Sequence, residues 1–293
     1  ITGTAGSSAA LSANSTSAQP GLTFVYQAKF NRDWSGTLLA LPIDGRGKVG
    51  DAAWDAGELI PSWKSRRIFT RGELNEGVEF LSCSGASAIG TTLVGLLNTS
   101  SSGTPDGLCQ KRLEWLRGST ADEQRNVNGV LRNRPPSEID PERTKVMGDI
   151  INSDPAYVEK HSNSYDQLPD GTPGKGTYKD FASSVGSRPA MVYVGANDGM
   201  FHAFDAKTGV EQFAYIPQGV HANLARLADP GYAHRYYVDG AVTAGDAYVR
   251  DQWRTVAVGG LNAGGRTIYA HDVTPAPAFL GRGDFSPLMA WLR

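Results

Sequence analysis

The stretch 191–209, MVYVGANDGMFHAFDAKTG, decides the fold of this chain. It begins with alternating apolar residues, reaches an Asn-Asp-Gly turn at 197–199, and resumes the alternation. A period of two is typical of a half-buried strand, and Asp-Gly readily adopts the positive φ of a tight hairpin turn. A second turn follows at 207–209, and residues 211–216 continue as a third strand. The stretch therefore predicts an antiparallel meander.

Two other stretches show the same order of strand, glycine turn, strand and aspartate. They are FVYQAKFNRDWSGTLLALPID at 24–44 and TVAVGGLNAGGRTIYAHD at 255–272. Segments rich in small residues, 147–158 and 237–249, precede two of the hairpins, as expected where strands crowd toward a central axis. One such strand plus a three-stranded meander makes a four-stranded blade, and repeated blades form a β-propeller. We predict an all-β fold, an incomplete β-propeller with about three blades visible, rather than a generic sandwich.

Glycines and acidic residues mark the predicted turns of these blades. They are Gly36, Asn197, Asp198, Gly199, Asp205, Gly209, Gly264, Gly265 and Asp272. A nucleotide-binding interpretation fails because the glycines at 259–265 do not form GxGxxG and no helix pattern follows. A repeated aspartate at a turn is interpreted as a cap, since its side chain accepts bonds from nearby backbone amides.

The chain divides into three parts by composition. Residues 1–20 carry no charge and are rich in Ser, Ala, Thr and Gly, which is typical of a flexible linker. Residues 21–275 form the partial propeller, and residues 276–293 form an irregular tail that lacks the strand pattern. A closed propeller needs at least about four blades, so the chain looks truncated.

An insertion interrupts the propeller at about 74–145, where strand alternation is absent. Apolar residues at helical spacing in 86–97 and 107–117 predict a partly helical segment, and 221–227 predicts a short helix between blades. Long insertions on a propeller rim cost little conformational free energy and often carry binding functions.

The two cysteines, Cys83 and Cys109, both fall within this insertion. Neither has a near partner, so they do not form a metal site of the Cys-x-x-Cys kind. A disulfide between them would stabilise the fold by about 3–4 kcal/mol and would imply an oxidising compartment. We predict this disulfide; two unrelated reduced thiols are the alternative.

Composition excludes several classes of protein. The chain has 293 residues and a net charge of -2, and 40% of its residues are hydrophobic. A disordered chain needs lower hydrophobicity and a higher net charge, and a nucleic-acid-binding protein needs a clustered basic surface. No apolar run approaches the ~20 residues that span a bilayer.

The sequence resembles the PilC/PilY family of type IV pilus biogenesis and tip-associated adhesins from about residue 24 to residue 273. The motifs that carry the resemblance are WSGTLLAL at 34–41, RRIFT at 66–70, LEWLRG at 113–118, MGDIINSDPAYV at 147–158, VYVGANDGMFHAFDAKTG at 192–209, HRYYVDGAV at 234–242 and AVGGLNAGG at 257–265. A lone VGxxDGxxHAFD run would be a weak match, because many quinoprotein-type repeats contain something close. The ordered series is specific.

The resemblance implies a non-enzymatic factor for type IV pilus assembly and tip adhesion. It implies a location in the periplasm or on the outer surface, at the tip of the fimbrium. Its partners would be minor pilins of the pilus tip complex and a host or abiotic surface, docked through the propeller. Members often bind Ca²⁺ through an EF-hand-like loop, but no D-x-[DN]-x-[DN]-G loop occurs here. Ca²⁺ therefore stays open as an implication of the resemblance; no cofactor is visible in the sequence, and we assign no residue as a metal ligand.

Two alternatives share the predicted propeller. A quinoprotein (PQQ-type) dehydrogenase needs a carboxylate beside calcium and a stacked quinone, and no calcium cluster is visible in the sequence. The six tryptophans are interpreted as core or blade packing. The second alternative is a passive secreted propeller that binds a carbohydrate or protein; fold alone does not decide between these functions.

Catalytic residues are not assigned. The sequence contains neither the GxSxG elbow of hydrolases nor an HExxH pair, and His202 is interpreted as a strand-face residue. Arg282, Gly283 and Asp284 form a candidate adhesion motif. A tripeptide is frequent by chance, and an ordinary turn is the simpler interpretation.

Overall fold

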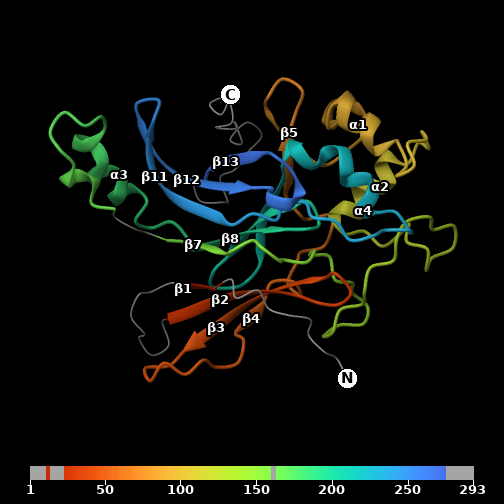
Figure 1. The fold of residues 1–293 in the computed structure, drawn as a ribbon, viewed down its shortest axis with the longest axis horizontal. Helices are drawn as coiled ribbons and strands as arrows, with labels where there is room; N and C mark the ends of the chain where they lie inside the picture. Colours follow the sequence, from red (N-terminus) through yellow and green to blue (C-terminus); the bar gives the residue numbers. More distant parts are fainter. Residues whose placement is uncertain (1–10, 14–22, 160–162, 275–293) are drawn as a thin grey trace.

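Three sheets stacked face to face form the computed structural model, which describes residues 11–13, 23–159 and 163–274 (Figure 1). The first sheet, red to orange in Figure 1, has the order β1 (Leu11–Ala13), β2 (Thr23–Phe30), β3 (Gly36–Ile43), β4 (Trp54–Asp55). The middle sheet has the order β6 (Gly77–Glu79), β5 (Ile68–Arg71), β10 (Glu211–Ile216), β9 (Met200–Asp205), β8 (Met191–Ala196), β7 (Ala156–Val158). The third has the order β11 (Val242–Val249), β12 (Gln252–Gly260), β13 (Ile268–Asp272).

The middle sheet is buried on both faces, which explains why β8 is a continuous apolar run. Val192 and Val194 pack in one cluster with residues of the first sheet, such as Leu38. Tyr193, the intervening residue, packs in the other cluster with Tyr269 of the third sheet. Alternation along one strand thus joins all three sheets, which is how propeller blades pack.

The predicted fold class is confirmed: the chain is an incomplete β-propeller with a partly helical insertion. The hairpins β2–β3, β8–β9 and β12–β13 fall in the three repeated stretches, and each is antiparallel. Each of the three sheets is one blade. They do not close into a ring within the described residues.

Two local expectations differ from the structure. Of the stretch 147–158, which was expected to be strand, only Ala156–Val158 forms one, because the backbone before it bonds to the turns of two blades. Residues 68–71 and 77–79 form an additional hairpin whose first strand pairs in parallel with β10. This hairpin widens the middle blade and includes three residues that were predicted to belong to a strand-free insertion.

The insertion contains two helices, α1 (Thr91–Leu97) and α2 (Cys109–Arg117), inside the two stretches with helical spacing. The expected short helix is η4 (Gln218–Asn223) followed by α4 (Leu224–Leu227). A further helix, α3 (Tyr178–Ser184), was not predicted. The remaining short turns are η1 (Gly85–Ser87), η2 (Tyr165–Gln167), η3 (Lys175–Thr177) and η5 (Asn262–Gly264).

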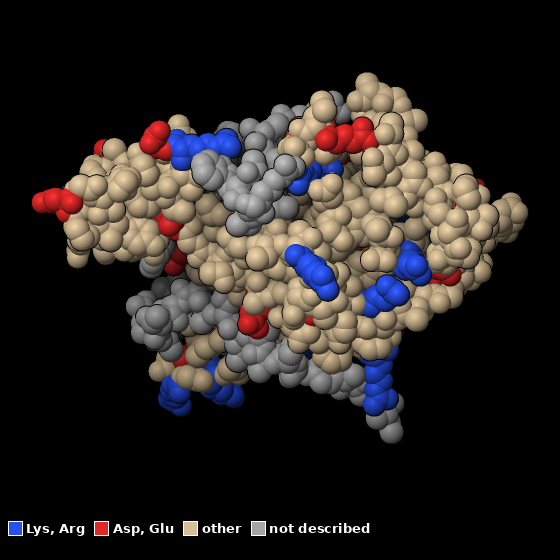
Figure 2. Space-filling view, turned by 45° about the horizontal axis from the view of Figure 1, so that its top comes forward, with Lys and Arg blue, Asp and Glu red and all other residues tan. Residues whose placement is uncertain are grey.

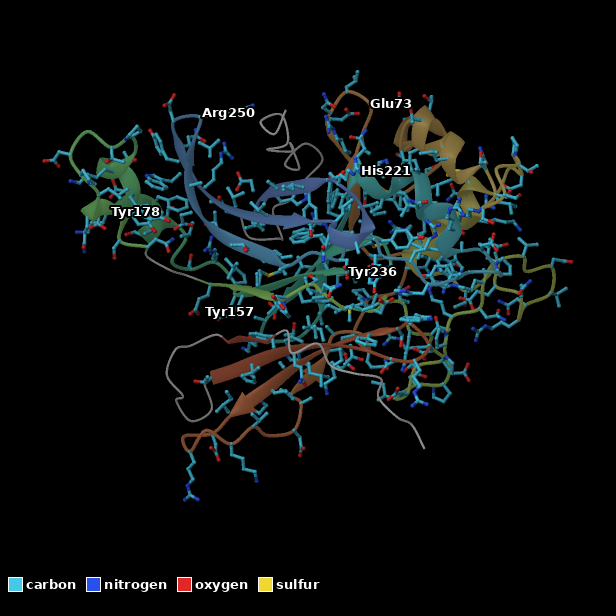
Figure 3. All side chains as sticks on the ribbon, in the orientation of Figure 1. Glu73, Tyr157, Tyr178, His221, Tyr236 and Arg250 are labelled. Carbon is cyan, nitrogen blue, oxygen red and sulfur yellow. A yellow bond between two sulfur atoms is a disulfide. The ribbon has the colours of Figure 1, made fainter. Side chains whose placement is uncertain are left out.

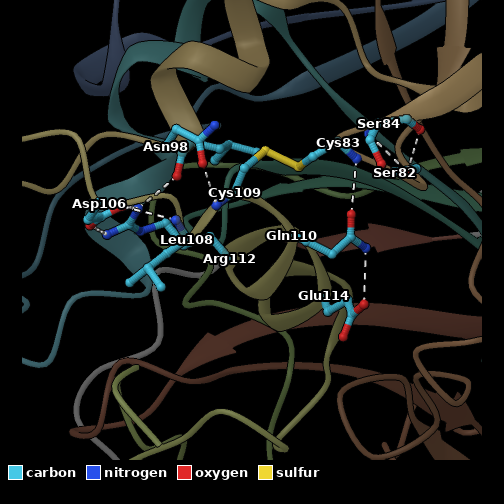
Figure 4. The surroundings of a disulfide bond; sticks show 11 residues. Ser82, Cys83, Ser84, Asn98, Asp106, Leu108, Cys109, Gln110, Arg112 and Glu114 are labelled. Atoms are coloured by element: carbon cyan, nitrogen blue, oxygen red, sulfur yellow. Dashed lines mark hydrogen bonds and ion pairs between the residues drawn. A yellow bond between two sulfur atoms is a disulfide. The ribbon is translucent and has the colours of Figure 1, made fainter.

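A disulfide joins Cys83 to Cys109, the first residue of α2 (Figure 4). Neighbouring hydrogen bonds hold the same place: the Cys83 amide donates to Gln110 Oε1, and the Cys109 amide donates to Asn98 Oδ1, both at 3.0 Å. The segment before α1 and both helices are therefore linked at a single point.

The ends of the chain are described only in part. Leu11–Ala13, within the stretch expected to be a linker, pairs antiparallel with β2. The rest of residues 1–20, the tail at 276–293 and the motif Arg282, Gly283 and Asp284 lie outside the described residues. Among the helices that the structure describes, none combines the length and the apolar character needed to cross a bilayer.

Candidate functional site

The motifs that were far apart in the sequence meet at the turn ends of the blades. The amide of Gly36, at the start of β3, donates to the Met147 carbonyl at 3.0 Å. Asn197, in the β8–β9 turn, receives the amide of Tyr237 on its Oδ1 at 2.8 Å. Asn152 donates from Nδ2 to Asp239 at 2.8 Å. Each of the two turns is therefore hydrogen-bonded to a segment that leads into the next blade, and the two segments are hydrogen-bonded to each other.

Glycine is required where these backbones touch. A Cβ on Gly36 would lie 2.0 Å from the Gly148 carbonyl oxygen, and a Cβ on Gly264 would lie 2.0 Å from the Tyr237 carbonyl oxygen. Both oxygens belong to backbone, so they cannot move aside as a flexible side chain would. The glycines let adjacent blades approach at their turns.

The structure places the other predicted turn residues as follows. Gly199 and Gly209 have positive φ values of 92° and 73°. Asp205 accepts hydrogen bonds from the amides of Lys207 and Thr208. Gly265 follows η5, and Asp272 ends β13, where it forms an ion pair with Arg254 and caps the Thr274 amide.

A buried ionic network lies beside the β8–β9 turn, which contains Asp198. Arg66, just before β5, donates from Nε and Nη2 to the two carboxylate oxygens of Glu211 at 2.7 and 2.8 Å. His202 lies 2.8 Å from Glu211 Oε1 through Nδ1, and 3.1 Å from both oxygens of Asp198 through Nε2. Asp198 Oδ2 also accepts the amide of Gly148 at 3.0 Å. Because both ring nitrogens of His202 face carboxylates, the imidazolium satisfies the site best.

Charge balance explains the electrostatics of this network. Burial alone would raise the pKa of Glu211, but Arg66 and His202 lower it to about 2. Burial would lower the pKa of His202, but Asp198 and Glu211 raise it to about 9. The two cations and two carboxylates therefore neutralise one another in the interior.

We expect stability to fall on the alkaline side because of His202. A group whose pKa is raised on folding stabilises the folded state below its unfolded pKa, here 6.5, and this contribution disappears as the pH rises through about 9. Between pH 7 and pH 9 the free energy of unfolding should decrease by about 2 kcal/mol. Urea unfolding at the two pH values measures this change.

Histidine variants separate this effect from other titrations. In His202→Gln the decrease between pH 7 and pH 9 should largely disappear, although the variant is less stable overall. His221 is the matched control, because burial lowers its pKa to about 4 and it stays neutral over this range. An equal decrease in the His202→Gln and His221→Gln variants would contradict the assignment.

The insertion is anchored to the same network by Arg117, the last residue of α2. Its guanidinium is fully buried and donates to the carbonyls of Phe80, Trp63 and Arg66 at 2.7, 2.9 and 2.7 Å. Arg66 Nη1 returns a bond to the Arg117 carbonyl at 3.0 Å. Because the motifs RRIFT and LEWLRG meet at these two arginines, the insertion is tied to the middle blade.

A small cavity lies beside the β8–β9 turn. Its volume of about 30 Å³ is enough for about two water molecules. Residues from the first blade, the insertion and the middle blade line it. The charged side chains among them are Asp33, Arg132, Arg134, Lys145, Asp149 and Asp198. The aromatic ones are Trp34, Trp115 and Tyr232.

Sequence reasoning found the turns but not the network. Asp198 was interpreted as a turn residue only, and His202 as a strand-face residue; their side chains are ion-paired in the interior. Arg66, Arg117 and Glu211 were not singled out, although two of them lie in motifs that carried the resemblance. Their signal is a charged residue in or beside a strand or helix, which one sequence does not distinguish from a solvent-exposed charge.

The site does not fit a calcium ion. Both oxygens of Asp198, the acid in the Asn-Asp-Gly turn, already accept hydrogen bonds from protein groups. Among the residues that the structure describes, three or more His, Cys, Asp or Glu side chains do not gather as a metal site would require. Figure 2 shows positive and negative side chains scattered over one face of the molecule.

Comparison with known proteins identifies the family. A family model described as the PilY1 beta-propeller domain matches residues 147–281. A type IV pilus biogenesis factor PilY1 homolog of Xylella fastidiosa is 36% identical over 92% of this chain and 20% of its own length. The type IV pilus biogenesis factor PilY1 of Pseudomonas aeruginosa (strain UCBPP-PA14) is 32% identical over 86% of this chain and 21% of its own length. The chain belongs to the PilC/PilY family.

The chain spans about a fifth of the length of these curated PilY1 relatives. Among solved structures, the C-terminal domain of Pseudomonas aeruginosa PilY1 matches at 38% identity, covering 42% of this chain and 23% of that chain with a TM-score of 0.31. The PilY1 propeller match begins at Met147, whose carbonyl receives the Gly36 amide. The family match thus includes strands β7 to β10 of the middle blade and the three strands of the third blade.

Proposed function

We propose that this chain is a propeller segment of a type IV pilus biogenesis factor, and that it works by docking other proteins. The similarity to PilY1 proteins over most of the chain carries this proposal. Its partners are minor pilins of the pilus tip complex and a host or abiotic surface. Its location is the periplasm and the outer surface, at the fimbrial tip, where the Cys83–Cys109 disulfide can form.

We propose that minor pilins dock on the surface of the insertion. Arg117 ties it to the blades, and the disulfide links its helices to the segment before them. A loop held on a rigid scaffold is the usual place for a binding site. Two of its apolar side chains, Val127 and Ile139, are 91% and 72% exposed. They can be changed without disturbing the core.

We expect Val127→Asp or Ile139→Asp to reduce docking. In the bacterium that encodes the chain, either substitution at the contact surface should lower co-purification of minor pilins by about tenfold or more, as a charge in an interface core does. The number of surface pili should fall in parallel. Deleting the whole insertion is a poorer test, because Arg117 would be lost from the blade.

Val49→Asp is the matched control, since Val49 is an exposed apolar residue of the first blade, outside the insertion. It should leave pilin co-purification and pilus number unchanged. Wild-type pilin capture by both insertion variants would exclude those two positions from the docking surface. Normal piliation without the chain would reject the proposed function.

We propose no catalytic activity for the segment. The names of the relatives, which are biogenesis factors, support this proposal. Ca²⁺ stays an implication of the family resemblance, and no described residue is proposed as its ligand. The acid and base groups of the network bind one another and do not face a substrate-sized cavity.

A further inference from the structure

Trp34 is exposed and held in an unfavourable backbone conformation. It lies in the β2–β3 turn, its φ is 62°, and 42% of its surface is accessible. A bulky residue seldom adopts positive φ, and such outliers concentrate at binding sites. The turn fixes the conformation: the Trp34 amide donates to the Asn31 carbonyl at 3.1 Å, and Asp33 Oδ1 accepts the Ser35 amide at 3.0 Å.

Two further rings from a distant segment complete an aromatic patch. The Trp34 ring stacks on His234 with centroids 3.8 Å apart and planes 22° apart. Tyr236 meets His234 edge-on at 5.2 Å and is 40% exposed. We call Trp34, His234 and Tyr236 the aromatic patch. It stands at the surface, so packing of the core does not explain it.

A buried carboxylate fixes the centre of the aromatic patch. His234 Nε2 lies 2.9 Å from Asp149 Oδ2, and Asn197 Nδ2 donates to the same oxygen at 2.7 Å. Asp149 and Asn197 are both almost fully buried. The ring on which Trp34 stacks is therefore rigidly oriented, so the patch is organised before a ligand arrives.

The residues that line the cavity beside the aromatic patch indicate which class of ligand it could bind. Three carboxylates and three cationic side chains line it, so it favours neither an anion nor a cation. Arg132, whose guanidinium stacks over Tyr232 at 4.1 Å, has a buried Nε without a hydrogen-bond partner. Such a donor is satisfied by a hydroxyl or by water. The volume, enough for about two water molecules, admits a hydroxymethyl group but no larger part of a ligand.

We propose that the aromatic patch and the adjoining cavity bind a neutral saccharide. The apolar face of a sugar ring lies on the accessible part of Trp34, and its hydroxyl groups are directed toward the cavity that Asp33 and Arg132 line. A neutral, polyhydroxylated ring matches an aromatic platform beside balanced charges, whereas an ion or a purely apolar ligand does not. The site lies where the insertion meets the first and middle blades; its lining includes Arg132 of the insertion but neither Val127 nor Ile139, the two positions that test pilin docking.

Saccharide titration of the whole chain tests this proposal. The probes are glucose, galactose, mannose and N-acetylglucosamine. Binding of each sugar is measured by calorimetry and by saturation-transfer NMR. At least one should bind with Kd of about 0.1–5 mM, and Trp34→Ala should weaken that binding by about tenfold or more. Arg132→Lys, which keeps the charge but removes Nε, should weaken it less.

Leu74→Ala is the matched control, because Leu74 is also exposed and apolar but lies next to Glu73 on the β5–β6 hairpin, far from Tyr236 (Figure 3). It should bind the sugar as the wild type does, and all three variants should unfold at similar temperatures. No binding of any probe at about 50 mM would overturn the proposal. So would sugar binding that is unchanged in Trp34→Ala, or minor-pilin binding lost in Trp34→Ala without any sugar binding.

Discussion

Replacing Arg66 by methionine should destabilise the protein by about 3–5 kcal/mol, because it leaves a buried carboxylate without its main partner. Arg66 and Glu211 are each 1% exposed and joined by two hydrogen bonds. Methionine fills much of the arginine volume, so loss of charge dominates over loss of packing. Urea unfolding at pH 7 measures the change in the free energy of unfolding.

A double variant separates the ion pair from the other contacts of Arg66. Glu211→Gln should also destabilise, but combined with Arg66→Met it should cost clearly less than the sum, since neither charge is then left alone. Lys64→Met is the control: Lys64 is exposed two residues away, and its substitution should change stability by less than about 0.5 kcal/mol. Additive single effects would show that the two side chains are not coupled.

Local patterns predicted those parts of the fold that local sequence determines. Alternation at 24–44, 191–216 and 255–272 predicted the hairpins, since each needs only a strand, a turn that glycine permits, and another strand. The parallel pairing of Ile68 with Ala214 could not be predicted from the sequence. The strand that contains Ile68 is four residues long, and nothing in so short a strand indicates which remote segment pairs with it.

The candidate site was harder to predict because its chemistry is non-local. Asp198 and His202 are four residues apart and could have been paired by inspection, but Arg66 and Glu211 come from elsewhere in the chain. A charge on a strand is ordinarily solvent-exposed; these charges are buried because the middle sheet is covered on both faces and Arg117 of the insertion packs beside Arg66. Trp34 was interpreted as packing, because sequence does not reveal that its turn projects the ring outward.

Removal of the disulfide, by changing Cys83 and Cys109 to serine, should lower the free energy of unfolding by about 3–4 kcal/mol. The bond closes a loop with a sequence separation of 26, and opening it frees the unfolded chain. The loss should appear in global unfolding, because α2 ends at Arg117, whose bond to the Arg66 carbonyl joins the insertion to the blade. Urea unfolding of both proteins measures it.

A reductant supplies the control, since it should lower the stability of the wild type to that of the double variant and leave the double variant unchanged. Limited proteolysis then distinguishes local from global effects. If the insertion were independent of the blades, protease would cut within residues 84–108 of the reduced protein while its urea midpoint stayed constant. We expect instead that cleavage and the urea midpoint change together, because Arg66 belongs both to the anchor of the insertion and to the buried ionic network.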